Sequence, residues 1–241
     1  MLISTSFNMY SDANGGDPDS TSPTLREYHR VLWSKPLPNG TCLDLVADGE
    51  GTYLYHRSSL GEFVLSSDAI THSYKNHARK TWLTRQIPED VNELFSEGST
   101  IGGYLIFPSN RIDGQHTINQ ARGVHPLIDD RFDLTLECIR RFYAGIVSPL
   151  TSVLDRYSDF FALFEDFRSY TSFFFLDDLL DEQGQTKFYL PFSDFAVPPG
   201  FTSVDDYLAY KKSVMQFLRC RNARIEEWVH IHSAGCHPDA E

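Results

Sequence analysis

The chain has 241 residues, of which 41% are hydrophobic and 14% aromatic, so it can bury a stable core and is not a disordered tail. Its net charge of −12 excludes an extended positively charged surface for the phosphate backbone, and we therefore expect no non-specific DNA binding. No apolar run is long enough to span a membrane, and the four cysteines lack metal or redox spacing. Together with the lack of a signal pattern at the first residues, this predicts a cytoplasmic protein without a cofactor.

The first part of the chain is predicted to form one helix and then short antiparallel strands. Ser22 can cap a helix that begins at Pro23 and ends at the proline-rich segment 35–40. Apolar runs separated by glycine-containing turns indicate strands beyond that helix, the last two forming a hairpin. These strands cover residues 42–46, 52–57 and 62–66.

The middle of the chain combines helices, a strong strand and a segment without periodicity. Helices are predicted over 76–85 and 88–97, and an uncharged strand over 101–107. Residues 108–128 show neither a helical nor a strand period. A loop of this length is either functional or contains an undetected element, and we interpret it as functional.

The last part of the chain is predicted to be mainly helical. Asp129 or Asp130 caps a helix that reaches Tyr143, and one further strand is expected over 187–192. The other predicted helices cover residues 148–157, 158–180 and 203–230. The pattern predicts an α+β fold, in which short antiparallel strands of the N-terminal half pack against a mostly helical C-terminal half. We expect a single domain over 1–241, strand-rich at 1–110 and helix-rich at 129–232.

Polar and charged side chains are concentrated between residues 110 and 141. Clustered arginines and an amide suit the recognition of phosphate or carboxylate, and histidines beside them can move protons near neutral pH. The candidate substrate-binding residues are Arg111, Asn119, Arg122, Arg131 and Arg140. The candidate catalytic residues are His116, His125 and Glu137.

Two interpretations of this polar segment stay open at the level of the sequence. The arginines either converge on a pocket or neutralise the many aspartates around them. On the helix that starts near residue 130, Glu137 precedes Arg140 and Arg141 by three and four residues, which is the spacing of internal ion pairs. The same polar face of this helix can equally face a ligand.

Other titratable residues are interpreted structurally. His29, Lys35 and Asp68 are expected at the surface or in capping positions, although each could instead fold back onto the loop over 108–128. Arg221 falls on the apolar stripe of the last helix, where a salt bridge is the favoured partner and a place in a pocket is second. A terminal group follows no closed zinc-site spacing, so no metal is expected. Its members are His230, His232, Cys236 and His237.

Four segments resemble a family of uncharacterised bacterial proteins. They are residues 22–26 (SPTLR), 32–38 (LWSKPLP), 118–123 (INQARG) and 130–141 (DRFDLTLECIRR). The similarity extends over most of the chain, to about Ile225. It implies a bacterial or phage setting and no particular activity.

Two functions of different classes follow, and the sequence leaves open whether the protein is an enzyme. The first is an enzyme that acts on a phosphate-bearing substrate such as a nucleotide or RNA, without a phosphate-binding glycine loop or a dinucleotide fingerprint. The alternative is an acidic, non-catalytic binding or regulatory protein of a bacterial conflict or phage system. Residues 124–200 carry six basic and thirteen acidic side chains, a net of −7, and are expected to meet a basic protein partner.

Overall fold

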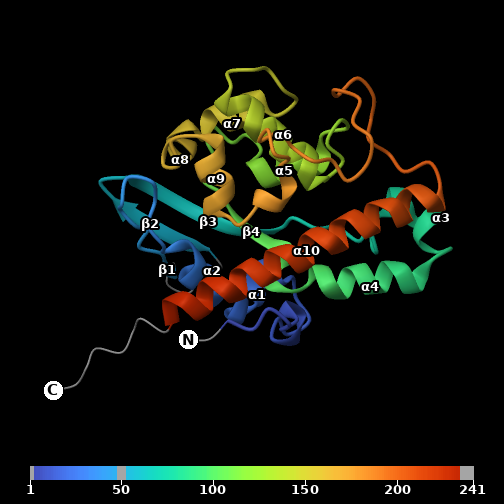
Figure 1. Cartoon of the computed structure of the whole chain (residues 1–241), viewed down its shortest axis with the longest axis horizontal. Helices are drawn as coiled ribbons and strands as arrows, with labels where there is room; N and C mark the ends of the chain where they lie inside the picture. The colour runs from blue at the N-terminus through green and yellow to red at the C-terminus, as the bar shows by residue number, and fades with distance from the viewer. Residues whose placement is uncertain (1–2, 48–52, 234–241) are drawn as a thin grey trace.

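A four-stranded antiparallel sheet lies between two groups of helices (Figure 1). The structure is a computed structural model, and it describes residues 3–47 and 53–233. The strands are β1 (Val46–Ala47), β2 (Leu54–Ser58), β3 (Gly61–Ala69) and β4 (Tyr104–Pro108), paired in that order. With helices dominating the C-terminal half, the fold is α+β, as predicted from the sequence.

The helices occupy distinct places around the sheet. The short α1 (Pro18–Thr21) and α2 (Pro23–Trp33) lie on one side, and the group from α5 (Ile118–Val124) to α9 (Phe167–Phe173) lies on the other (Figure 1). The long α10 (Val204–Ser233) crosses the molecule alongside α4 (Pro88–Gly98). A continuous cluster of buried hydrophobic residues joins α2, the sheet and α10. No helix in the described part of the chain has the length and apolar character that crossing a membrane requires.

The hairpin of β2 and β3 forms where the sequence predicts it. Ser58 pairs with Gly61, which leaves a two-residue turn, and Gly61 has a φ of 131° that other residues rarely adopt. A Cβ at this position would also lie 2.7 Å from the ring of Phe63. Beyond the hairpin, β3 pairs with β4, which is buried along its whole length because its apolar residues are covered on both faces.

Two predicted strands are wrong. Residues 42–46 contribute only the first residue of β1, while Cys42 forms an isolated bridge with Pro36. Residues 187–192 form no strand within the described chain. The backbone N–H of Tyr189 instead donates to the buried Asp133 carboxylate over 2.9 Å, and Pro191 has no N–H to offer to a ladder.

Helix boundaries follow the prediction where caps are strong. Ser22 accepts a hydrogen bond from the N–H of Leu25 over 3.0 Å and starts α2, and Pro88 starts α4. The predicted helix 76–85 instead divides into a 3-10 turn, η2 (Ala78–Lys80), and α3 (Thr81–Thr84). The strand predicted from residue 101 begins with another 3-10 turn, η3 (Ile101–Gly103).

The predicted helix 158–180 is broken into three pieces. Glu165 and Phe175 take φ values of 63° and 55°, which end one helix and turn the chain after the next. The pieces are α8 (Ser158–Ala162), α9 (Phe167–Phe173) and the 3-10 turn η4 (Asp177–Leu179). The aromatic residues are still buried, since the breaks allow their rings to pack against each other from several directions.

The segment interpreted as a functional loop contains a helix. Residues Ile118–Val124 form α5, which begins with a capping box of Thr117 and Gln120. It is followed by α6 (Phe132–Tyr143) and α7 (Thr151–Arg156). The prediction that Asp129 or Asp130 caps α6 is wrong, because the cap position is Arg131, which makes no side-chain cap bond.

Arg221 on α10 is completely buried without the predicted salt bridge. Its hydrogen bonds within the described chain go to the carbonyl oxygens of Phe174, Gly102 and Tyr104, at 3.2, 2.7 and 2.8 Å. Close packing brings these carbonyls within reach, since a Cβ at Gly102 would lie 2.4 Å from the Asn222 amide oxygen. Arg221 therefore joins α10 to the start of β4 and to the chain after α9.

Candidate functional site

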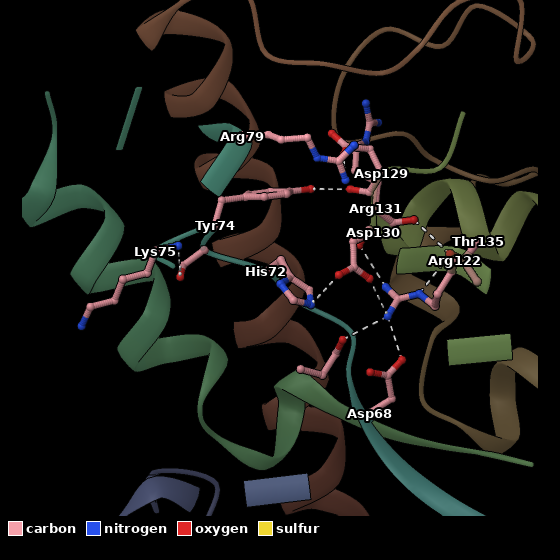
Figure 2. A network of polar contacts seen from close by, with 12 residues as sticks. Asp68, His72, Tyr74, Lys75, Arg79, Arg122, Asp129, Asp130, Arg131 and Thr135 are labelled. Atoms are coloured by element: carbon pink, nitrogen blue, oxygen red, sulfur yellow. Dashed lines mark hydrogen bonds and ion pairs between the residues drawn. The ribbon is translucent and has the colours of Figure 1, made fainter. Parts of the chain in front are cut away.

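Arg122 of α5 is the centre of a buried ionic network at the end of β3. The side chain has no exposed surface, and its Nη1 lies 2.7 Å from the Asp68 carboxylate and 3.1 Å from that of Asp130. Figure 2 shows the guanidinium between these two carboxylates. The pKa of Arg122 is raised, because the attraction of Asp68 and Asp130 outweighs the lowering effect of burial.

The remaining donors of Arg122 are also satisfied. They reach the carbonyl oxygens of Ala69 and Asp130, at 3.2 and 3.0 Å, and the Thr135 hydroxyl at 3.3 Å. These acceptors belong to β3, to the turn before α6 and to α6 itself. Arg122 thus connects three segments by charge-assisted hydrogen bonds and is not free to bind a ligand.

The turn between α5 and α6 presents two consecutive carboxylates. Asp129 and Asp130 have φ values of 49° and 63°, in the left-handed region that aspartate tolerates better than most residues. Asp129 forms an ion pair with Lys80 at 2.6 Å, and its carbonyl accepts a hydrogen bond from the Tyr74 hydroxyl at 3.1 Å (Figure 2). The turn is therefore held on both sides, which orients Asp130.

Asp130 connects the buried network to a half-exposed histidine. Nε2 of His72 lies 3.0 Å from the Asp130 carboxylate, on the side away from Arg122 (Figure 2). Burial raises the pKa of Asp130, but Arg122 and His72 outweigh burial and hold it well below its usual range. An ionised Asp130 accepts a hydrogen bond from the Nε2–H of His72, which in a neutral ring leaves the lone pair on Nδ1.

His72 borders a cavity of about 300 Å³ formed mainly by the segment between β3 and η2. This volume is at the small end of ligand sites. Its lining, drawn from described residues, contains two histidines and a lysine and no carboxylate. The polar lining side chains are Tyr10, Thr71, His72, Ser73, Tyr74, Lys75, Asn76, His77, Ser99 and Tyr104.

Two buried polar atoms of this lining have no hydrogen-bond partner in the described chain. They are the Thr71 hydroxyl oxygen and Nδ1 of His77. Burying such groups without partners is unfavourable unless a ligand or water completes them. Lys75 is exposed, forms no ion pair among the described residues and points away from the carboxylates of the network (Figure 2). Its amine lies 4.5 Å from the centre of the Phe95 ring.

The predicted arginine pocket does not form around the predicted residues. Besides Arg122, the buried Arg131 is paired with Asp133, and Arg140 lies 2.8 Å from Glu137. Glu137 also accepts hydrogen bonds from Arg141 and from the Thr186 hydroxyl. Burial raises the pKa of Glu137, but the hydrogen bonds from Arg140 and Arg141 outweigh it and lower the pKa. These contacts agree with the interpretation in which the arginines neutralise nearby acidic residues by internal ion pairs.

The other predicted residues lie apart. Arg111 and His116 are exposed, while Asn119 and His125 are half-buried. Among the described residues, no predicted site residue lines the cavity beside His72. Arg131 borders a different cavity of about 300 Å³, whose lining includes Asp206.

Sequence reasoning missed His72, Thr71, Lys75 and His77. A signal was present, since residues 71–77 form a polar run directly after a strand. Two further interpretations are wrong: Asp68 is buried in the network, and His29 is buried, with Nε2 2.9 Å from the Ser67 hydroxyl. Burial lowers the pKa of His29 to about 3.

No cluster of metal-ligating side chains occurs within residues 3–47 and 53–233. Part of the terminal histidine and cysteine group, Cys236 and His237, lies outside the described residues.

Comparison with known proteins gives one match. Residues 3–225 match DUF6994, a family of unknown function. The chain belongs to this family. Searches of the curated proteins and of the solved structures gave no match. The matched residues include both the ionic network and the lining of the cavity beside His72.

Proposed function

We propose that the protein binds a small phosphate-bearing molecule, of the size of a mononucleotide, in the cavity beside His72. One observation carries this proposal: in a protein of net charge −12, the cavity is lined by a lysine and two histidines and by no carboxylate. The other cavity of about 300 Å³, beside Arg131, has Asp206 in its lining. No carboxylate belongs to the described lining, so an anion placed here meets donors first, and Asp130 lies behind His72.

The unpartnered polar atoms give the bound anion specific contacts. The Thr71 hydroxyl can donate to a phosphate oxygen, and a neutral His77 with its proton on Nδ1 can do the same. Lys75 supplies the positive charge at the open side. The phenyl ring of Phe95 and the phenol of Tyr10, whose centres are 5.0 Å apart, offer apolar surface to the remainder of the molecule.

We infer a proton-transfer role for His72. Asp130 holds Nε2, so Nδ1 can take a proton from an attacking hydroxyl or water, or return one to a leaving oxygen of a phosphate ester. Arg122 is a positioning residue in this arrangement, because it orients Asp130 and has no surface of its own. The chemistry relies on orientation and charge stabilisation by the protein.

Binding is tested by calorimetry with inorganic phosphate and with the four ribonucleoside monophosphates. Thr71→Val and Lys75→Ala are each expected to weaken binding at least tenfold, since each removes a donor or the charge from the cavity. Lys212→Ala removes an exposed lysine of α10 outside this cavity and is the matched control. No binding by the wild-type protein at millimolar concentrations, or equal losses in all three variants, would contradict the proposal.

Turnover is tested separately with the mononucleotides that bind, each of which is itself a phosphate ester. His72→Gln preserves a hydrogen bond to Asp130 but removes the titratable nitrogen, and it is expected to lower kcat by about 10²–10⁴ with binding changed by less than threefold. Binding without turnover in the wild-type protein would reject the proton-transfer role and support the non-catalytic, ligand-binding alternative.

A further inference from the structure

Lys35 lies in a cage of aromatic rings, remote from the cavity beside His72. Its Nζ is 3.4 Å from the ring centre of Phe175 and 4.9 Å from that of Phe173. The indoles of Trp33 and Trp228 lie at 5.6 and 5.7 Å. The cage is assembled from the end of α2, the chain after α9 and the last part of α10, so its members are far apart in the sequence. Lys35, expected at the surface or in a capping position, is half-buried among these rings.

No carboxylate forms an ion pair with Lys35 among the described residues. The charged groups that face it from the surrounding elements are Arg221 of α10 and Asp177 of η4. The Arg221 guanidinium lies on Trp33, 6.0 Å from the ring centre. Of the nearby histidines, His29 is buried and contacts Trp33, and His232 stacks on Trp228 at the surface. The uncompensated guanidinium of Arg221 repels an ammonium at Lys35.

The protonation of Lys35 is decided by opposing effects. Burial and the repulsion from Arg221 outweigh the attraction of Asp177 and lower the pKa of Lys35 to about 7. Aromatic faces favour the ammonium form, but each such contact contributes modestly. An uncharged lysine in apolar surroundings beside another cation is the arrangement that makes an amine nucleophilic.

We propose that Lys35 is a nucleophilic amine that condenses with an aldehyde or ketone carrying an aromatic or apolar group. The nitrogen lone pair attacks the carbonyl carbon and forms a C–N bond, while the carbonyl electron pair moves to oxygen. A proton passes from nitrogen to that oxygen, giving a carbinolamine. Loss of water then leaves an imine, so no oxidant or reductant is consumed.

The cage suits both the reagent and the product. Lys35 and Trp228 are half-buried, so the cage keeps some contact with solvent, while Phe173 and Phe175 are buried. Stacking on these rings favours an aromatic aldehyde over a hydrophilic one. A protonated imine retains the cation that the rings favour and is shielded from hydrolysis. The inference does not depend on the phosphate-binding proposal.

The test uses the intact wild-type protein, with benzaldehyde as the probe and cyanoborohydride present to trap the imine. Labelling of each lysine is followed by peptide mass spectrometry between pH 6 and 10.5. Lys75 is the internal control, because it is exposed and contacts one ring instead of four. Lys35 is expected to react at least tenfold faster than Lys75 at pH 7, and the ratio is expected to fall as the pH rises to 10.5.

A Lys35 rate no higher than that of Lys75 at pH 7, or one that rises in parallel with it up to pH 10.5, would overturn the proposal. Either result means that the rings hold the amine as an ammonium. Trp228→Ala tests the cage itself and is expected to slow Lys35 labelling at pH 7 at least threefold by admitting water. Trp82→Ala removes an exposed tryptophan elsewhere and is the matched control. Equal rates in the two variants would contradict the role of the cage.

Discussion

Two completely buried arginines of this protein are accommodated in opposite ways. Arg122 lies between two carboxylates, and the pKa of its guanidinium is raised. Arg221 has only carbonyl oxygens as acceptors within the described chain, and one of its nitrogens, Nη2, has no partner there. Burial lowers the pKa of Arg221 to about 9. The same residue type is thus neutralised in one place and only hydrogen-bonded in the other.

The difference shows how the surroundings of a buried charge determine its effect on neighbouring groups. The charge of Arg122 is balanced locally and orients Asp130 towards His72. The charge of Arg221 is unbalanced, so it repels an ammonium at Lys35. The guanidinium lies over the ring of Trp33, which also contacts Lys35. What is lost when each is removed also differs: two buried carboxylates lose their cation in the first case, and three carbonyls lose a donor in the second.

The largest effect is expected for Arg122→Met. It leaves Asp68 and Asp130 without their cation in a buried site, so the free energy of unfolding should fall by about 3–5 kcal/mol. Urea denaturation monitored by circular dichroism measures this loss. Adding Asp68→Asn to the variant should recover part of it, because one uncompensated charge is then removed. A loss below about 1 kcal/mol would mean that the network is solvated and not balanced by Arg122.

A smaller loss is expected for Arg221→Met. The three carbonyls lose a donor, but no carboxylate is left unpaired, so the free energy of unfolding should fall by about 1–3 kcal/mol in the same measurement. The variant should also slow Lys35 labelling at pH 7, since the repulsion that lowers the pKa of Lys35 is absent. A destabilisation equal to that of Arg122→Met would remove the distinction between the two arginines.

The smallest effect is expected for Asp19→Asn, which should raise the free energy of unfolding by an amount that depends on pH. Asp19 is a further carboxylate beside Asp68 of the ionic network. Burial and the nearby Asp68 raise the pKa of Asp19 to about 8, so the folded state keeps a proton that the unfolded chain releases near pH 4. The stability due to this proton is complete below pH 4 and is lost as the pH rises through 8. Asparagine avoids that loss.

Asp19→Asn should therefore match the wild type near pH 4 and exceed its free energy of unfolding by about 1 kcal/mol or more at pH 8. Urea denaturation across this range measures the difference. Asp159→Asn, at an exposed carboxylate, is the control and should show no such trend. A constant difference between the Asp19 variant and the wild type at all pH values would show that Asp19 is ionised in the folded protein.

Local signals predicted the fold where they were strong. Ser22 and Pro23 started α2, Pro88 started α4, and the two-residue turn before Gly61 was recognised as a hairpin. Predictions failed where tertiary contacts override a local pattern. The apolar run 158–180 has a helical composition, yet it breaks at Glu165 and Phe175 because the rings pack best from several directions.

The sequence singled out part of the ionic network but none of the described residues that line the cavity. The polar segment contained Arg122 and Asp130, which do form the centre of the ionic network. Their partners were missed, because Asp68 is 54 residues from Arg122 in the sequence and periodicity carries no information about such pairs. The same argument applies to Lys35, whose cage includes a tryptophan from the last helix.

The amino-acid sequence by itself determined the α+β class, the hairpin, the capped helices and the acidic character, because each depends on residue type and on spacing within a few turns. Only the tertiary structure decided which charges are neutralised. Arg122 and Arg221 look alike as buried residues of helices, and whether a carboxylate or a carbonyl meets each one depends on segments that folding brings together. For the same reason, two polar atoms without a partner in the described chain, on Thr71 and His77, lie in residues that line the cavity beside His72, away from the arginines that the sequence singled out.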